Sequence, residues 1–188
     1  MLFDREAEPG KNRPLLAFIL VTLLVGASGT FFTEPNIPTW YAGLAKPSFN
    51  PPNWLFAPVW TTLYILMAVA AWRVWKIASP AYEAQSGGDA VAGRQASEGR
   101  GGKGLKSPEM ALWGVQLALN FLWTPLFFGA HLLLVALVEM AALWLAIAAT
   151  AVLFWRKDRV AGLLMLPYLA WVSFALCLNY AIWQLNGG

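Results

Sequence analysis

The sequence contains one cysteine, Cys177, and one histidine, His131. A single cysteine excludes an intramolecular disulfide, and these two residues cannot build a zinc site or a cysteine-ligated iron–sulfur cluster. The chain also shows no acid–base dyad or nucleophile–base pair of the kind that hydrolytic enzymes use. We therefore expect no obligatory cofactor, no metal and no conventional hydrolytic activity.

Charge is also scarce. Only 12% of the 188 residues are charged and 59% are hydrophobic, whereas a soluble domain carries about twice that charged fraction. Five apolar runs are long enough to cross the ~30 Å hydrocarbon layer of a membrane, and they are continuous rather than alternating, which excludes a β-barrel. The chain is therefore predicted to be an all-α, multi-pass membrane protein, and its net charge of +3 does not indicate nucleic-acid binding.

The five runs define one membrane domain over residues 1–188. The predicted spans are 15–32, 54–77, 109–128, 132–155 and 160–184. Ser107 is expected to cap the third span and Asn53 the second, while Pro125 should bend or end the third span and Pro167 should interrupt the fifth. The connection between the third and fourth spans is so short that these two helices must be antiparallel neighbours.

The first run could alternatively be the apolar part of a signal peptide, with residues 25–27 (VGA) as its cleavage site. The acidic residues Asp4, Glu6 and Glu8 before it, and the length of the run, favour a membrane span. Residues 79–106 are rich in Gly, Ser and Ala and have few large apolar side chains, so they are predicted to be a disordered linker.

The first loop, residues 33–52, has a different character. The stretch from residue 40 to residue 60 reads WYAGLAKPSFNPPNWLFAPVW and holds four prolines and three tryptophans. Proline removes a backbone donor and disfavours helix at the residue before it, so residues 40–52 cannot form a regular helix. Dense aromatic residues on such a stiff backbone predict a structured lid over the helices.

Basic residues predict the orientation in the membrane. With five spans, twelve of the 13 Lys and Arg residues fall on one side and only Lys46 on the other. Because basic loops stay in the cytoplasm, we expect a cytoplasmic N-terminus, with the lid and the C-terminus on the opposite side. A bacterial inner membrane fits this arrangement best.

Three separated motifs resemble the TspO/MBR family, which includes translocator protein, the peripheral benzodiazepine receptor and the tryptophan-rich sensory protein. The first motif has the form WYxxLxKPxxxPPxWxFxPVW. The others are residues 116–120 (QLALN) with 123–129 (WTPLFFG), and residues 167–171 (PYLAW) with 178–180 (LNY). The resemblance covers the chain apart from the N-terminal tail and residues 79–106.

The resemblance implies a five-helix bundle, commonly dimeric, that binds porphyrins such as protoporphyrin IX or haem-like tetrapyrroles and serves in stress sensing and tetrapyrrole regulation. Two alternatives remain open: a light-dependent porphyrin-degrading enzyme, and a transporter of porphyrins or sterols. Two departures from the family bear on these expectations. Ser48 stands where some relatives have a bulky aromatic residue, and no basic residue follows Tyr180, which leaves the weak sterol pattern incomplete.

The same motifs imply a set of site residues. The expected ligand-binding residues are Trp40, Tyr41, Phe49, Pro51, Trp60, Tyr64, Gln116, Asn120, Trp171 and Ala175. Trp60 and Trp171 would form the walls of the pocket, although membrane-interface tryptophans are the alternative. Asn120 would serve either the ligand or helix–helix contact, and Gly114 with Ala118 forms a small-residue pair expected at a dimer interface.

Two further residues have open roles. Glu139 lies inside the fourth span, where ionisable residues are functional candidates, but it could instead simply reach interfacial water. His131 could ligate haem, although a lone loop histidine is more commonly solvated.

Overall fold

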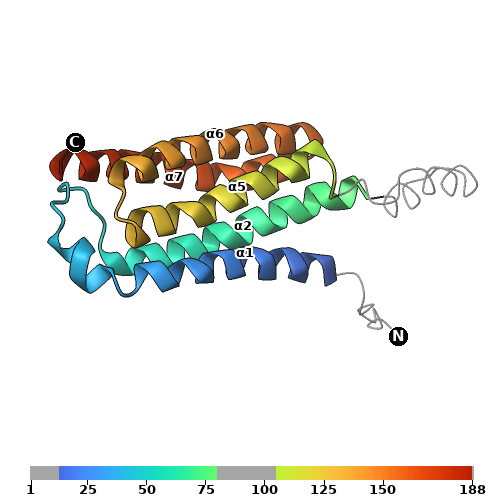
Figure 1. The fold of residues 1–188 in the computed structure, drawn as a ribbon. Coiled ribbons are helices and arrows are strands. Elements are labelled where there is room, and N and C mark those ends of the chain that lie inside the picture. The colour runs from blue at the N-terminus through green and yellow to red at the C-terminus, as the bar shows by residue number, and fades with distance from the viewer. Residues whose placement is uncertain (1–12, 80–104, 188) are drawn as a thin grey trace, which may run out of the picture.

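The computed structural model describes residues 13–79 and 105–187. They form five long helices, and no strand is present among these residues. The helices are α1 (Arg13–Thr33), α2 (Phe56–Ile77), α5 (Pro108–Thr124), α6 (Leu133–Lys157) and α7 (Arg159–Leu185). By length and apolar composition all five can cross a membrane, which confirms the predicted helical membrane bundle (Figure 1).

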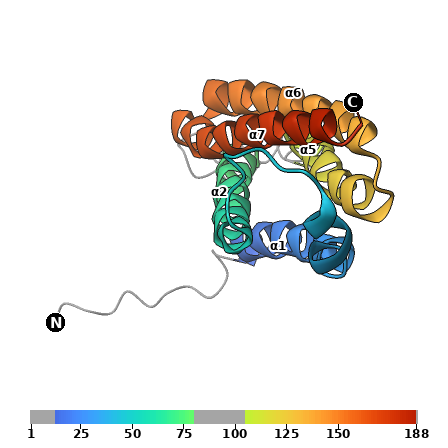
Figure 2. The same ribbon diagram turned by 90° about the vertical axis from the view of Figure 1, so that its left-hand side faces the viewer.

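Helix packing follows a closed ring rather than chain order. α1 packs on α2, α2 on α7, α7 on α6, α6 on α5, and α5 returns to α1. The view along the bundle in Figure 2 shows this order. α5 and α7 have little direct contact and are joined through α6, as expected for the antiparallel pairs on either side of it. The inner face of α6 therefore lies between α5 and α7, which have few contacts with each other.

Packing differs between the two ends of the ring. Away from the first loop the interior is filled by large buried side chains such as Met67, Ile147, Phe154 and Met165. A second cluster, which includes Tyr41, Phe127, Phe128 and Ile182, lies beneath the loop. Large apolar side chains such as those of Leu24, Phe31 and Val138 cover the outside, as a lipid-facing surface requires.

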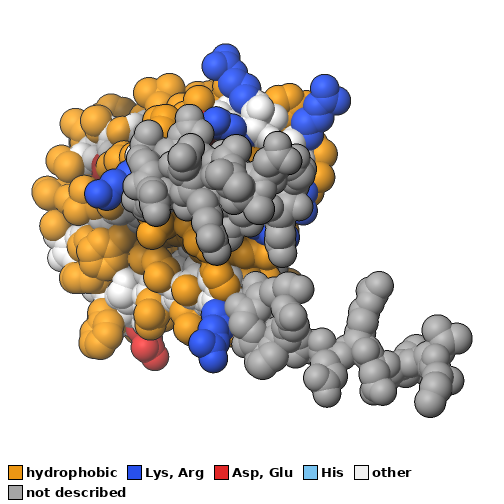
Figure 3. All heavy atoms as spheres, turned by 90° about the vertical axis from the view of Figure 1, so that its right-hand side faces the viewer, with side chains coloured by type: hydrophobic (Ala, Val, Ile, Leu, Met, Phe, Trp, Pro, Cys, Tyr) orange, Lys and Arg blue, Asp and Glu red, His pale blue; other side chains and the backbone are white. Residues whose placement is uncertain are grey.

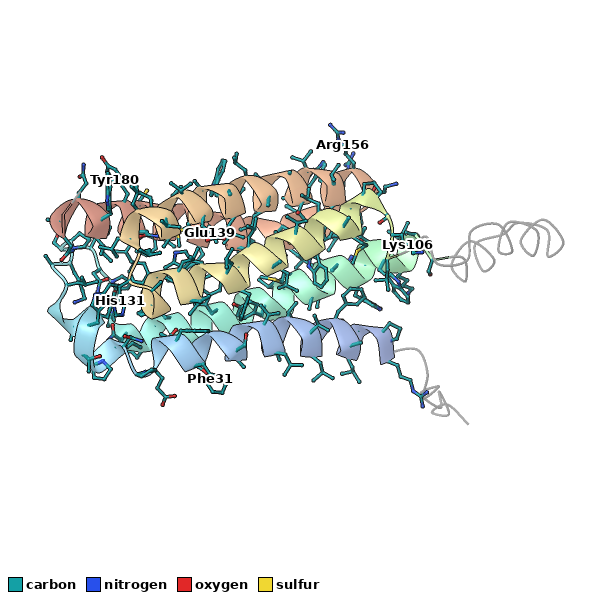
Figure 4. All side chains as sticks on the ribbon, in the orientation of Figure 1. Phe31, Lys106, His131, Glu139, Arg156 and Tyr180 are labelled. Carbon is teal, nitrogen blue, oxygen red and sulfur yellow. The ribbon has the colours of Figure 1, made fainter. Side chains whose placement is uncertain are left out.

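The end of the bundle remote from the first loop carries the basic residues. Figure 3 looks onto this end and shows Lys and Arg side chains around its rim, and Figure 4 labels Lys106 and Arg156 there, with His131 at the opposite end. Two ion pairs tie helices together at the basic end. Arg73 Nε lies 2.6 Å from Asp158 Oδ2, and Lys157 Nζ lies 3.3 Å from Glu109 Oε1. The structure thus separates the described basic side chains from Lys46, as the charge count predicted.

Capping was predicted correctly at one helix and wrongly at another. The Ser107 hydroxyl accepts a hydrogen bond from Met110 N at 3.3 Å, which confirms it as the cap of α5. The prediction for Asn53 was wrong, because Asn53–Leu55 forms a single 3₁₀ turn before α2, and Leu55 takes the N-cap position of α2. The sequence did not reveal that an extra turn precedes the helix.

The prolines inside the spans behave differently from one another. Pro125 ends the α-helical part of the third span, which continues as a π-helical turn, Pro125–Gly129. Pro167 does not interrupt the fifth span, because α7 runs without a break through it. Its ring is on the exposed face of α7, and transmembrane helices tolerate proline when their neighbours hold them in place. The predicted interruption was therefore wrong.

The predicted linker falls mainly on residues 80–104, which lie outside the described residues.

Candidate ligand-binding site

The first loop is not entirely irregular. Ile37–Tyr41 forms one π-helical turn, and residues 45–52 are non-helical, with a turn at residues 48–49 that is closed by a hydrogen bond from Asn50 N to Pro47 O at 3.0 Å. The expectation of a non-helical lid thus holds for its proline-rich second half only. This segment, residues 34–52, is called the lid below.

The lid is attached to the connection between α5 and α6. The Trp40 indole stacks on the His131 ring with centroids 4.0 Å apart and planes 13° apart. His131 adopts a left-handed backbone conformation, φ 58°, and its Nε2 lies 3.0 Å from Asn36 Oδ1. Trp40 also meets the edge of Phe127 at 5.4 Å. His131 is therefore exposed but not simply solvated, because both its ring face and one ring nitrogen contact the lid.

A second attachment joins the lid to the end of α7. Ala45 N donates to Asn186 Oδ1 at 3.0 Å, and Asn186 Nδ2 donates to Ala45 O at 2.9 Å. The same Nδ2 donates to Ile182 O at 2.7 Å, in the last turn of α7. Asn186 therefore ties the helix end and the lid backbone together. Nothing in the sequence motifs had indicated this residue.

Inside the lid, polar side chains stabilise this non-helical segment. The Tyr41 hydroxyl donates to Asn50 Oδ1 at 3.0 Å, and Asn50 Nδ2 donates to Pro51 O at 3.1 Å. Burial raises the pKa of Tyr41, and the hydrogen bond to Asn50 opposes this only in part. Lys46 Nζ donates to Leu44 O at 3.0 Å and lies 4.6 Å from the centre of the Tyr41 ring. Tyr41, Lys46 and Pro51 thus hold the shape of the lid.

Aromatic side chains continue from the lid into the bundle. Phe49 meets Phe174 of α7 at 6.3 Å, and Phe56 meets Trp171 at 5.9 Å. Deeper in the bundle, Trp60 lies 5.6 Å from Tyr64 and 6.1 Å from Tyr168. Trp60 and Trp171 are both partly buried and pack on the core. Both tryptophans therefore belong to the interior of the bundle, as a pocket wall requires.

A hydrogen-bonded chain crosses the bundle at Asn120. The Tyr64 hydroxyl donates to Asn120 Oδ1 at 2.7 Å, and Asn120 Nδ2 donates to the Tyr168 hydroxyl at 2.9 Å. Asn120 thus links α2, α5 and α7. Of its two predicted roles, the structure shows the helix–helix contact, with both ends of the amide already bonded to protein.

Tyr64 requires a glycine opposite it. A Cβ atom placed on Gly26 of α1 would lie 2.3 Å from Tyr64 Cε2, far inside van der Waals contact. Gly26 therefore allows α1 to approach the tyrosine that begins the hydrogen-bonded chain.

The structure brings together only part of the predicted ligand set. Gln116 is fully buried on α5 and its Nε2 lies 4.0 Å from Met67 Sδ, so it faces α2. Ala175 packs on the same core from α7. Gly114 and Ala118 lie elsewhere, on the exposed face of α5, and a Cβ on Gly114 would meet no atom within 4 Å. Within the described residues, both members of the small-residue pair are therefore exposed on the surface of the bundle.

Several buried polar atoms have no hydrogen-bond partner among the described residues. They are both carboxylate oxygens of Glu139, both amide atoms of Asn179, Gln116 Oε1, and the indole Nε1 atoms of Trp113, Trp123 and Trp171. The alternative in which Glu139 reaches interfacial water was wrong, because its oxygens have almost no accessible surface. The ring of helices turns this face of α6 inward.

Sequence reasoning missed Tyr168, Asn179 and Trp123 as site residues, although all three lie within the motifs it singled out. A polar or aromatic residue in a continuous apolar helix gives no sign of the direction it faces. One open surface hollow, of about 550 Å³, lies between Pro47 and the end of α7; it is lined by none of the predicted ligand residues. The described residues contain no group of three or more His, Cys, Asp or Glu side chains that could hold a metal ion.

The fold and site define an integral, multi-pass membrane protein in which five helices form a ring beneath an anchored aromatic lid. Residues 18–184 match the TspO/MBR family. The chain is 40% identical to protein CrtK of Rhodobacter capsulatus, over 91% of each chain, and 38% identical to the tryptophan-rich sensory protein of Cereibacter sphaeroides, over 93% of this chain and 94% of that one. Human translocator protein is 36% identical over 93% of this chain and 91% of its own. The chain belongs to the TspO/MBR family, and this membership supports a sensory or translocator role in a membrane.

Proposed function

We propose that the protein binds a porphyrin, or a similar flat hydrophobic molecule, inside the part of the ring that lies beneath the lid, and that this binding serves a sensory response to tetrapyrroles. Trp60 and Trp171 would stack against the ligand. Offset stacking of aromatic rings contributes about 1 kcal/mol beyond the buried area.

One observation carries the proposal: buried polar atoms without a partner lie beside aromatic side chains under the lid. The Trp171 indole N–H has no acceptor in the described parts of the chain, and its ring packs 5.9 Å from Phe56 and 5.5 Å from Phe174. Buried polar groups are normally hydrogen-bonded, so an unpaired one needs an explanation. A bound molecule with both apolar faces and polar edges would account for both features.

The test is a titration of the purified protein with protoporphyrin IX in detergent, followed by tryptophan fluorescence. Trp60→Phe combined with Trp171→Phe is expected to weaken binding at least tenfold. Trp155→Phe is the matched control, because Trp155 is exposed on α6 at the basic end. Saturable binding that is equal in all three proteins would contradict the site.

We also propose that two copies associate through the outer face of α5. Gly114 and Ala118 are exposed one turn apart there, with Val115 and Leu122 beside them. Small residues spaced four apart allow two membrane helices to approach closely. The orientation expected from the basic residues, with the N-terminus cytoplasmic, belongs to the same proposal.

A further inference from the structure

Glu139 differs from the other described acidic residue that is buried in a span. Glu109 lies near the basic end and pairs with Lys157. Glu139 lies on α6 toward the lid, on the same buried stripe as Ala136, Met140 and Leu143, and Figure 4 labels its position along the bundle. Only 8% of the surface of Glu139 is exposed.

The carboxyl group has no partner in the part of the chain that the structure describes. Both oxygens lack a hydrogen bond and both are shielded from solvent. An unpaired charge within a membrane is expensive, and such residues normally pair or mark a functional site. Helix–helix contact does not explain this side chain, because a residue serving that purpose would be bonded to another helix, as Asn120 is.

A second unpaired polar group lies at the same height. Trp144 Nε1 donates to Ser173 Oγ at 2.7 Å, which fixes the register of α6 against α7. Since the two helices are antiparallel, Glu139 lies five residues from this bond toward the lid and Asn179 lies six. At 1.5 Å per residue these are rises of about 8 and 9 Å. Asn179 is 2% exposed, and neither of its amide atoms has a hydrogen-bond partner within residues 13–79 and 105–187.

Two inward-facing polar side chains at one level, neither using its hydrogen-bonding capacity, are the arrangement expected of a recognition site. We propose that Glu139 accepts a hydrogen bond from an N–H group of the bound ligand, and that the ligand class is therefore a flat apolar ring system bearing a ring N–H, such as a pyrrole or indole type. Charged or neutral, a carboxyl group offers at least one acceptor oxygen. This inference rests on the ligand site proposed above. It adds the hydrogen bond by which that site would distinguish ligands with a ring N–H from ligands without one.

The experiment compares carbazole with dibenzofuran by isothermal titration calorimetry in one detergent. The two probes are flat tricyclic molecules of nearly the same shape, and only carbazole has an N–H. A site built around a buried acceptor discriminates against a ligand that leaves the acceptor unpaired. We expect the wild-type protein to bind carbazole at least about tenfold more tightly than dibenzofuran.

Three variants isolate the role of Glu139. Glu139→Leu removes the acceptor and should abolish the preference for carbazole, while Glu139→Gln keeps one acceptor oxygen and should retain part of it. Glu109→Gln changes the acid that pairs with Lys157 at the basic end of the bundle and should retain the full preference for carbazole. Because the Glu139 carboxyl group has no hydrogen-bond partner among the described residues, Glu139→Leu should not lower the Tm. A large fall in Tm would show a structural role and overturn the inference.

Protoporphyrin IX, which has pyrrole N–H groups, separates the two proposals. If it binds but Glu139→Leu neither weakens its affinity nor changes the ratio between the tricyclic probes, the role of Glu139 is wrong and the ligand site stands. Equal binding of carbazole and dibenzofuran to the wild-type protein would likewise show that the proposed role of Glu139 is wrong, without contradicting the ligand site. If none of the three molecules binds, the ligand site itself is wrong and the inference falls with it.

Discussion

Asn186 and Ala45, 141 positions apart in the sequence, are joined by two reciprocal hydrogen bonds of 3.0 and 2.9 Å. Because Asn186 also bonds the last turn of α7, this amide connects the end of the fifth span to the backbone of the lid. The arrangement couples any opening of the lid to the terminal turn of α7.

Replacing Asn186 with alanine should therefore loosen the lid. We expect amide exchange at Ala45 to quicken at least tenfold in hydrogen–deuterium exchange, and the ligand to dissociate faster. Asn186→Asp keeps the acceptor for Ala45 N but loses the donor, so an intermediate effect is expected. Asn53→Ala, at an exposed asparagine outside this contact, is the control. Unchanged exchange in Asn186→Ala would show that the other attachments hold the lid alone.

The Tyr64–Asn120–Tyr168 chain should contribute measurably to stability. Asn120→Ala leaves two buried hydroxyl groups without their partner, and each such loss costs about 1–3 kcal/mol in proteins. Tyr64→Phe removes one hydroxyl and its bond together, and the Asn120 carbonyl alone loses a partner. We therefore expect the Tm to fall more for Asn120→Ala than for Tyr64→Phe. The reverse order in thermal unfolding would show that the network is not shared among three helices.

Gly26 offers a steric test of how α1 packs. Gly26→Ala places a methyl group where the Tyr64 ring lies, at 2.3 Å, so α1 must shift or the ring must turn. A destabilisation of roughly 1–3 kcal/mol is expected, as for overpacking in a filled core. The matched change is Gly43→Ala in the lid, where the new Cβ would meet no atom within 4 Å. Equal Tm values for the two variants would contradict the packing of α1 on Tyr64.

The predictable and unpredictable features of this chain have physical causes. The spans follow from continuous apolar runs, and the Ser107 cap follows from local sequence, so neither needs tertiary information. The helices form a ring in which α5 and α7 pack mainly through α6 and meet directly at the Asn120–Tyr168 hydrogen bond, and this order decides which faces turn inward. Glu139 was therefore placed in the correct span, but the burial of its carboxyl group inside the ring was not predicted. Tyr168 was read as part of a motif but not as a partner of Asn120. The stacking of Trp40 on His131 brings the lid against the connection between α5 and α6. These two segments are far apart in sequence, so no local pattern predicts their contact.

Asp158 should make the protein sensitive to acid. Burial raises the pKa of Asp158, but hydrogen bonds from Arg73 and from the backbone N–H groups of Val160 and Ala161 outweigh this and hold the pKa below its ordinary value. The unfolded chain thus binds the proton more tightly than the folded protein. The stabilisation is complete above the ordinary carboxyl pKa of about 4 and is lost as the pH falls through the lower, folded-state value.

The measurement is the Tm as a function of pH between about 6 and 3. Asp158→Asn should lower the Tm at neutral pH and flatten its decline in acid, since the carboxyl that titrates is gone. Lys76→Gln is the control, because Lys76 is an exposed cation in the last turn of the same helix as Arg73. A wild-type acid slope that persists in Asp158→Asn would assign the sensitivity to another group.

Association through α5 can be tested with a single cysteine. Cys177 is the one native cysteine and is exposed, so it is first replaced by serine. Ala118→Cys then places a thiol on the exposed face of α5, and two copies related by a two-fold axis through this face would bring their thiols together. Mild oxidation in membranes should give a disulfide-linked dimer in high yield. Val138→Cys, on the exposed outer face of α6, is the control and should stay monomeric. Linkage through residue 138 but not through residue 118 would move the interface to α6, and the small pair Gly114 and Ala118 would then have to be explained by contact with lipid.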